Sequence, residues 1–239
     1  MMGLGTLINT AGILFGGLAG HFFGRLLKER HQNSLTAACG VSVLFIGIAG
    51  AMQGMLVLQD GAVVSGQAML VTLCLALGTL AGEIINIEGW FERFGEWLKA
   101  KTGNARDQKF VNAFVTASLT VCIGAMAIVG AIQDGILGDY SILATKAILD
   151  FIIIMVMSCS LGKGCVFSAL PVLAVEGLIT VFASFLKPIF TDLAMQYLSL
   201  IGSILIFCVG LNLVWGKKIR VANMLPAVVL AVIASYLPI

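Results

Sequence analysis

Charged residues are scarce in this chain. Only 11% of its 239 residues are Asp, Glu, Lys or Arg and 59% are hydrophobic, whereas soluble domains carry about 25% charged residues. The mean hydropathy is +1.05. This composition excludes an ordinary soluble protein, and a net charge of +2 gives no sign of nucleic-acid binding. It predicts a single transmembrane domain over residues 1–239, because the apolar segments leave no length for a separate soluble domain.

Motifs for metal binding and catalysis are missing as well. The two histidines, His21 and His31, lie ten residues apart, and the six cysteines show no CxxC or Cys/His spacing. Neither a metal site nor a disulfide framework is therefore indicated. The HExxH, GxSxG and P-loop spacings do not occur either. We expect no enzymatic activity, no cofactor and no metal.

What the chain has is long apolar runs. A helix of about 20 apolar residues crosses a hydrocarbon layer of ~30 Å, and no basic residue precedes the first run, so a cleaved signal peptide is not indicated. The predicted fold is an all-α, polytopic bundle of about eight spans. They cover residues 4–24, 35–58, 66–86, 110–133, 141–161, 164–186, 193–215 and 221–238.

Basic residues give the orientation of these spans. With eight spans, twelve of the fourteen Lys and Arg residues fall in loops on one side, and only Lys146 and Lys187 do not. Basic loops stay in the cytoplasm, so both termini are predicted outside. Residues 88–101 place aromatic residues on one helical face and charges mostly opposite, which predicts an amphipathic helix lying in the cytoplasmic membrane interface.

Glycines mark the packing faces. Four recur at every fourth residue in the first span, at Gly12, Gly16, Gly20 and Gly24. Such a row, a glycine zipper, lets another helix approach closely. We expect packing within one subunit, and a homo-oligomer interface stays open as an alternative.

A weak internal repeat runs through the glycine-containing segments. Gly17-Leu18 in the first span matches Gly177-Leu178 in the sixth, and residues 46–48 in the second match residues 209–211 in the seventh. An offset of five spans reverses the direction of crossing. Spans 1–3 and 6–8 would therefore form an inverted repeat, as in many secondary transporters.

The fifth span carries a lysine and an aspartate. Lys146 and Asp150 are four residues apart and share a helical face. A rise of about 1.5 Å per residue places Asp150 roughly 14 Å into the span. A charge at the centre of a spanning helix costs roughly 2.5–3.5 kcal/mol, so it normally pairs or lines a water path. A pair that only cancels its own charge stays open, as does a Lys146 that reaches to water at the outer end.

Three further residues are candidates for a pathway. Glu176 is a second deep acid, in the sixth span, where Pro171 is expected to free a backbone carbonyl nearby. Asn9, near the outer end of the first span, and Gln133, in the fourth, offer amides to a solute or ion. Interhelical hydrogen bonds explain these amides, and those of Asn212 and Asn223, equally well.

Several short motifs also resemble a known family. They are GTLIN at 5–9, GAIQDG at 130–135, KAILD at 146–150, FSALPV at 167–172 and NMLPA at 223–227. Together they are similar to a bacterial inner-membrane family of unknown function with YdfK-like and YqgA-like members, some of them labelled candidate transporters. The resemblance implies a multi-helix protein of the bacterial plasma membrane and supplies no site residues.

Two functions follow from these observations. The first is a secondary transporter or channel for a small solute or ion, with its site near the midplane of spans 5 and 6. The alternative is a scaffolding membrane protein that packs through glycine-rich helices without transport. The lipid bilayer is the expected partner in both.

Overall fold

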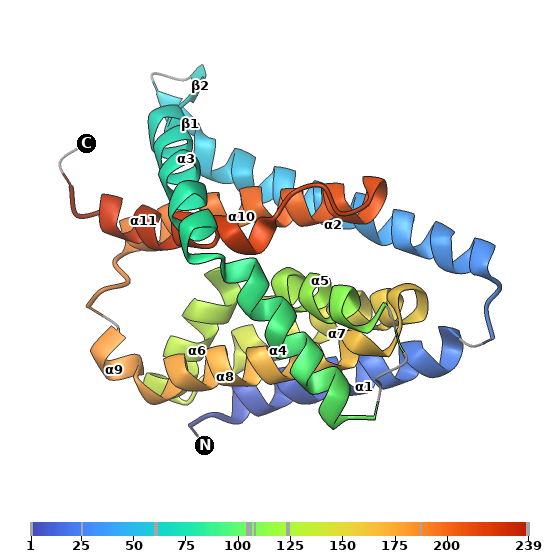
Figure 1. Ribbon diagram of the computed structural model, residues 1–239. Helices are drawn as coiled ribbons and strands as arrows, with labels where there is room; N and C mark the ends of the chain where they lie inside the picture. The colour runs from blue at the N-terminus through green and yellow to red at the C-terminus, as the bar shows by residue number, and fades with distance from the viewer. Residues whose placement is uncertain are drawn as a thin grey trace.

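The computed structural model describes residues 2–24, 26–59, 62–103, 107, 109–122, 125–186 and 188–237. Its helices form two groups (Figure 1). The first contains α1 (Leu4–Gly24), α5 (Phe110–Cys122), α6 (Ala125–Leu137), α7 (Ser141–Leu161) and α8 (Ala169–Val181). The second contains α2 (Glu29–Met55), α3 (Ala68–Ile85), α10 (Asp192–Trp215) and α11 (Pro226–Ala234).

Short elements connect these helices. They are the strands β1 (Leu56–Gln59) and β2 (Ala62–Ser65), the helix α4 (Ile87–Lys101), the 3-10 helices η1 (Lys163–Ser168) and η2 (Val221–Met224), and the single turn α9 (Ala183–Leu186). Arg25, Arg106 and Lys187, which entered the count of basic loop residues, lie outside the described residues.

Within the described residues, six helices are long and apolar enough to cross a membrane, or seven if α5 and α6 count as one bent span. The expected eighth span corresponds to a shorter apolar helix, Val221–Ala234. The protein is therefore a polytopic helix bundle, as predicted, while the count of eight stays a prediction.

The expected fourth span is broken. In place of one helix over 110–133 the structure has α5 and α6, which meet at an angle of 63°. The expected sixth span, 164–186, is one helical segment over Lys163–Val181, in which the 3-10 helix η1 runs into α8, and the turn α9 follows it. The length and hydropathy of these segments were read correctly, but breaks inside an apolar run leave both properties unchanged.

A β-hairpin joins α2 to α3, which the all-α prediction missed. Strands β1 and β2 pair antiparallel, with Leu56 opposite Ser65 and Gln59 opposite Ala62. Valine, which favours the extended conformation, occurs in both strands at Val57, Val63 and Val64. The second span consequently ends at Met55, earlier than the expected residue 58.

Helices α1 and α7 pack most closely, through the glycine row. A Cβ added to Gly16 would lie 2.4 Å from the Phe151 carbonyl oxygen, and one added to Gly20 would lie 2.0 Å from that of Met155. Gly12 and Gly24 lie against Ala147 and Cys159 in the same way. Because the residue numbers rise together on both helices, α1 and α7 run parallel.

The second group packs antiparallel. Gly40 of α2 lies against Leu213 and Val214 of α10, while Gly54 lies against Leu200. Between α3 and α11 the same order appears, since Gly78 meets Ala227 and Gly82 meets Asn223 of η2. The two groups meet where α2 packs on α7 and where α10 contacts α5 and α6.

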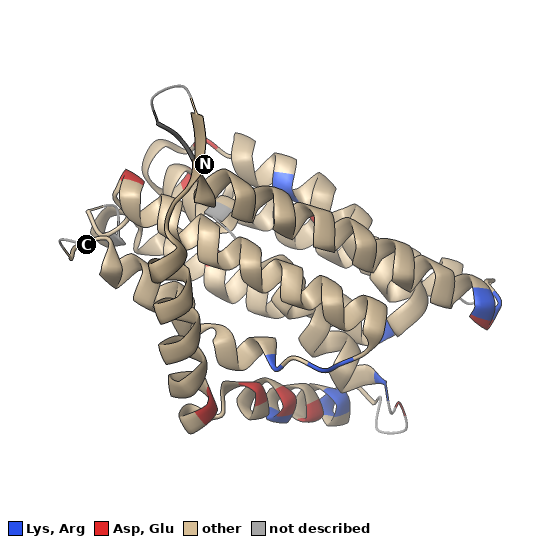
Figure 2. Cartoon of the chain, turned by 90° about the horizontal axis from the view of Figure 1, so that it is seen from above, with Lys and Arg blue, Asp and Glu red and all other residues tan. Residues whose placement is uncertain are grey.

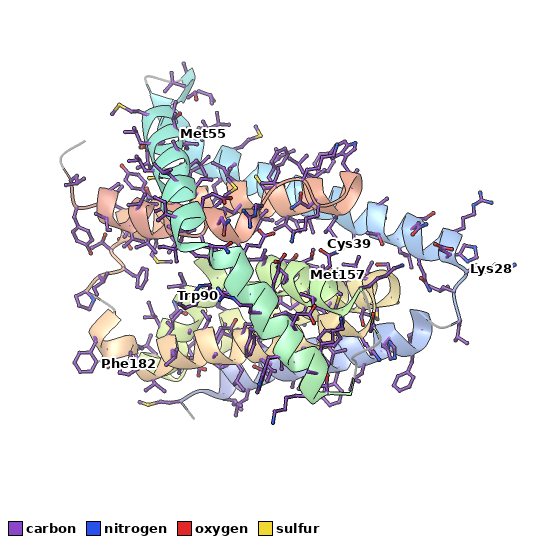
Figure 3. All side chains as sticks on the ribbon, in the orientation of Figure 1. Lys28, Cys39, Met55, Trp90, Met157 and Phe182 are labelled. Atoms are coloured by element: carbon purple, nitrogen blue, oxygen red, sulfur yellow. The ribbon has the colours of Figure 1, made fainter. Side chains whose placement is uncertain are left out.

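Helix α4 crosses the first group and carries many of the charges (Figures 1 and 2). It begins at Ile87, directly after Asn86, whose left-handed backbone (φ 56°) allows the sharp turn out of α3. Its expected apolar face is split between two directions. Trp90, Phe94 and Trp97 are exposed, whereas Leu98 is buried against the core. Figure 3 shows Trp90 on this helix and Cys39 and Met157, both buried, within the bundle.

Candidate functional site

Four polar side chains meet inside the first helix group. Asn9 comes from α1, Lys146 and Asp150 from α7, and Glu176 from α8, and we call these four residues the charge cluster. Their exposed fractions are 0, 6, 5 and 1%. Asp150 lies nine residues into α7, and the neighbouring Phe151 is level with Gly16 near the centre of α1. The cluster is therefore buried between the first third and the middle of α1 and α7, the longest helices of this group.

Contacts join all four residues. Lys146 Nζ donates to Asp150 Oδ2 and lies 3.6 Å from Glu176 Oε1. Asn9 Nδ2 donates to the same Glu176 oxygen over 2.8 Å. The spacing of Lys146 and Asp150 puts them on one face of α7, and the close approach of α1 through its glycines brings Asn9 within reach of α8.

The break between α5 and α6 supplies a fifth partner. Carbonyl groups in the last turn of a helix have no N–H donor within that helix, and the helix end carries a partial negative charge. Because α5 ends at Cys122, the Val121 carbonyl lies in its last turn, and Lys146 Nζ donates to this carbonyl over 2.9 Å. A broken helix that turns its end toward a buried charge is a common feature of transporter sites.

The cluster holds more acid than base. With both carboxyls ionised, Asp150 and Glu176 outnumber Lys146 by one negative charge. Two buried oxygens of the cluster, Glu176 Oε2 and Asn9 Oδ1, have no hydrogen-bond partner among the described residues. An unpaired buried charge is costly, so this arrangement is suited to holding a positively charged species.

A second polar contact lies one turn further toward the N-terminus of α1. Thr6 Oγ1 and Thr180 Oγ1 are 3.1 Å apart. Asp134 of α6, which is fully buried, accepts hydrogen bonds from the backbone N–H groups of Gly5 (2.9 Å) and Thr6 (3.3 Å). It caps α1 from 129 residues away, because the first N–H groups of a helix need partners and attract negative charge.

The structure brings four of the five candidate pathway residues together and separates the fifth. Gln133 is only half-buried, and among the described residues it makes no hydrogen bond to the cluster. Its neighbour Asp134 was missed, although an acid beside a glycine in an apolar segment was a usable signal. Lys146 turns inward to its acids, away from the N-terminal end of α7, which was the predicted outer end.

The expected effect of Pro171 stays a prediction. Pro171 lies in the first turn of α8, three residues after the 3-10 helix η1 ends, within the helical segment Lys163–Val181. The interruption before Glu176 is the 3-10 helix η1, which ends at Ser168. The amides of Asn212 and Asn223 bond backbone groups of Ile219 and Glu88 and hold loops at the ends of helices.

A cavity of about 240 Å³ reaches the cluster from between the two helix groups. Lys146 and Asp150 form part of its wall, together with Thr120 at the end of α5. On the opposite side α10 contributes Ser199 and Ser203. The cavity is large enough for several waters or a small ion with its hydration shell, since one water occupies about 30 Å³ in the liquid.

A second hollow, of about 190 Å³, lies at the other end of the same interface. It is lined by Asn112 and Thr116 of α5, by Thr36 of α2, and by the ion pair of Glu88 and Lys217. We call it the inner vestibule, because its residues lie at the ends of α2, α5 and α10 where the predicted cytoplasmic loops begin. Leu119 borders the vestibule and Thr120 the first cavity, so adjacent residues of α5 line the two hollows.

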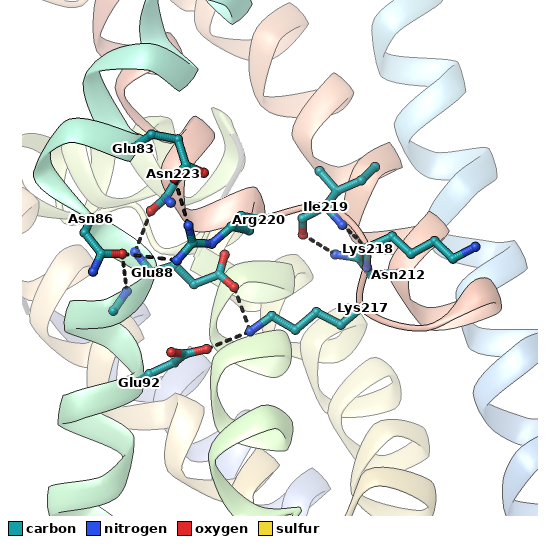
Figure 4. Close-up of polar contacts among 11 residues, drawn as sticks. Glu83, Asn86, Glu88, Glu92, Asn212, Lys217, Lys218, Ile219, Arg220 and Asn223 are labelled. Carbon is teal, nitrogen blue, oxygen red and sulfur yellow. Dashed lines mark hydrogen bonds and ion pairs between the residues drawn. The ribbon is translucent and has the colours of Figure 1, made fainter.

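Ion pairs close the loops around the inner vestibule (Figure 4). Lys217 Nζ lies 2.6 Å from Glu88 Oε1 and 2.8 Å from Glu92 Oε1, linking α4 to the loop after α10. Arg220 pairs with Glu83 over 2.8 Å. Burial opposes the charge of Lys217, but the hydrogen bonds and charges of the two glutamates outweigh it and raise the pKa of Lys217 above its ordinary value.

Among the described residues there is no group of three or more His, Cys, Asp or Glu side chains that could hold a metal ion. The six cysteines are free thiols. The chemistry that this arrangement supports is the binding and exchange of charge by carboxyl, ammonium and amide groups.

Comparison with known proteins places similar sequences in two bacteria. Residues 4–236 match the family described as "Protein of unknown function (DUF554)". The chain is 29% identical over 226 residues to the uncharacterized membrane protein YdfK of Bacillus subtilis (strain 168), covering 95% of this chain and 93% of YdfK. It is 30% identical over 234 residues to the uncharacterized protein YqgA of Escherichia coli (strain K12), covering 96% and 95% of the two chains. No solved structure shows significant similarity to it.

Proposed function

We propose, from the premise that this chain belongs to the DUF554 family of proteins of unknown function, that it is a secondary transporter or channel for a small solute or ion and has no catalytic activity. The family resemblance read from the short sequence motifs is confirmed by this match. That the protein is a multi-pass membrane protein agrees with the name of its relative YdfK and with its apolar helices. The transport role is our proposal.

One observation carries this proposal: two acids and a lysine are buried together beside a cavity. In hydrocarbon, ionisable residues of this kind are expensive and typically mark ion or substrate paths. Here Lys146 and Asp150 both line the cavity of about 240 Å³ between the helix groups. A pair that served only to cancel its own charge would need neither a third charge, Glu176, nor an adjacent hollow.

The two hollows suggest the route. The first cavity and the inner vestibule lie along one interface, formed by α2, α5, α7 and α10, and the adjacent α5 residues Leu119 and Thr120 line one hollow each. We infer that the solute passes along this interface between the helix groups. Lys217 and its glutamate partners would then close the cytoplasmic end.

We propose eight spans in the bacterial plasma membrane with both termini outside, and the relative helix directions agree with the alternation that eight spans require. Spans 1 and 5 must cross in the same direction, and α1 and α7 run parallel. Spans 2 and 7 must cross in opposite directions, and so must spans 3 and 8; their helices run antiparallel. The directions therefore fit the predicted alternation at each of these pairs.

An inverted repeat receives partial support. Gly47 of α2 lies against Phe207 of α10, and Gly210 of α10 lies against Leu44 of α2. If Gly47 corresponds to Gly210, Leu44 corresponds to Phe207, so a two-fold axis exchanges these contacts. The other matched pair lacks this symmetry, because Gly17 meets Val166 whereas a Cβ on Gly177 would have nothing within 4 Å among the described residues.

Flux through reconstituted protein tests the function. We would incorporate the full chain into liposomes containing a pH-sensitive dye and impose Na⁺, K⁺ or pH gradients in turn. The wild type should dissipate one of these gradients, and Asp150→Asn should slow it at least tenfold. Asp139→Asn is the matched control, because Asp139 is an exposed acid in the loop before the same helix. Equal flux in Asp150→Asn and wild type would show that the site is wrong.

A scaffolding protein remains the alternative outcome. The glycine row that would favour it is already covered by α7 of the same chain, which leaves less of α1 for a partner. A wild-type protein that moves none of the tested ions, yet is isolated in a stable complex with another membrane protein, would support this alternative instead.

A further inference from the structure

We infer that the species exchanged at the charge cluster is a single proton, taken up by Glu176. This inference rests on the proposed function and specifies the chemistry of the same site. It starts from the two oxygens that the cluster leaves without a partner, Glu176 Oε2 and Asn9 Oδ1, which belong to residues with exposed fractions of 1% and 0%.

Each donor group near these oxygens already has an acceptor partner. The Lys146 ammonium group already contacts the Val121 carbonyl, Asp150 and Glu176 Oε1. The Asn9 amide donates to Glu176 Oε1, and the Thr6 and Thr180 hydroxyls pair with each other. An acceptor left unsatisfied in a buried position costs about 1–3 kcal/mol, so the site favours a species that supplies a donor.

Charge balance gives the size of the missing charge. Ionised Asp150 and Glu176 exceed Lys146 by one unit, so one positive charge neutralises the cluster and a divalent ion would reverse its sign. The other titratable groups on packed elements do not alter this count. Asp134 of α6 has its own positive partner in the N-terminus of α1, which donates to its Oδ2, although its Oδ1 has no partner among the described residues, and Cys122 of α5 is a free cysteine.

The position of Lys146 favours a proton over a metal ion. Lys146 lines the cavity, but Glu176 does not, and the Lys146 ammonium lies 3.6 Å from Glu176 Oε1. A metal ion from the cavity would approach Glu176 past a fixed positive charge. A proton needs no coordination shell, whereas a metal cation would require several oxygen ligands. A proton bound to Glu176 Oε2 supplies both the missing hydrogen-bond donor and the missing positive charge.

Infrared difference spectroscopy tests the inference without any transport measurement. We would titrate the full chain in lipid nanodiscs and follow the C=O stretching band of a protonated carboxyl group. The wild type should show a band equivalent to one carboxyl that disappears as the pH is raised. Glu176→Gln should abolish the band. Asn9→Leu should shift it to higher frequency, because the Asn9 amide no longer bonds the Glu176 carboxyl.

Glu88→Gln is the matched control. Glu88 is about as buried as Glu176, with an exposed fraction of 2%, but its Oε1 lies 2.6 Å from Lys217 Nζ, so this substitution should leave the band unchanged. A band that survives Glu176→Gln, or the absence of any titrating carboxyl band in the wild type, would overturn the inference. So would stability that depends on Na⁺ or K⁺ concentration and not on pH. If the band is present and flux is absent, the proton site stands and the transport function fails.

Discussion

Replacing Lys146 by methionine should destabilise the protein far more than neutralising its partner. Lys146→Met leaves Asp150, Glu176 and the free Val121 carbonyl facing one another without a cation. Asp150→Asn leaves Lys146 paired with Glu176. Although both substitutions break the same ion pair, only the first leaves two acids uncompensated.

The magnitudes follow from the geometry. With Glu176 ionised, at 3.6 Å and an effective dielectric constant of about 20, the attraction between Lys146 and Glu176 is roughly 4–5 kcal/mol before desolvation. Breaking a buried ion pair by removing one partner typically costs about 3–5 kcal/mol. We expect Lys146→Met to fall in that range, and Asp150→Asn to cost about 1–3 kcal/mol, the penalty of a buried group left without its bond.

The free cysteines provide the assay. Cys39, Cys74, Cys165 and Cys208 are buried, so a thiol-reactive fluorogenic dye reports unfolding as the temperature rises. For a chain of this size, Lys146→Met should lower the midpoint by roughly 6–20 °C. Adding Glu176→Gln to Lys146→Met should recover part of the loss, because one of the two facing acids is removed. The reasoning fails if Asp150→Asn lowers the midpoint as much as Lys146→Met, or if the added Glu176→Gln lowers it further.

Three further predictions concern packing, capping and the inner loops. Gly20→Ala should cost about 1–3 kcal/mol of stability, because the added Cβ would lie 2.0 Å from the Met155 carbonyl oxygen. Gly177→Ala has open space around its Cβ and should stabilise α8 by about 0.5–1 kcal/mol. Equal thermal unfolding midpoints for the two variants would contradict the α1–α7 packing. Asp134→Ala should cost about 0.5–2 kcal/mol by removing the cap of α1, and hydrogen exchange should increase at Gly5 and Thr6, while unchanged exchange there would rule out the cap. Because the pKa of Lys217 is raised in the folded protein, its ion pairs stabilise the protein fully below the ordinary pKa of 10.5 and lose this effect as the pH rises through the folded pKa. The unfolding midpoints of wild type and Lys217→Met should therefore differ at pH 8 and converge only above about pH 10.5. A difference that vanishes near neutral pH would argue against these pairs.

Much of the bundle was accessible from local patterns. The bounds of 4–24 and 141–161 coincide with α1 and α7, and α4 was expected one residue from its observed start. These elements were readable because hydropathy and helical periodicity depend on neighbouring residues. The break between α5 and α6 was not, because an apolar run keeps its hydropathy when it bends.

The site was predicted in part for the same reason. Lys146 and Asp150 stand on one helix, so their spacing alone placed them together. Asn9 and Glu176 are 167 residues apart, and although each was a candidate, nothing in the chain indicated that they bond to each other. Asp134 was missed because its role as a cap depends on where α1 begins in space.

By itself the sequence determined that this protein spans a membrane, where its long helices lie and which charged residues they carry. It could do so because each residue contributes separately to the free energy of moving a helix into an apolar layer. Only the tertiary structure decided that Asn9, Lys146, Asp150 and Glu176 face one another beside a cavity. This arrangement depends on how the helices rotate and how closely they approach. The glycines of α1 permit the close approach, and the backbone of α7 packed against them fixes the rotation.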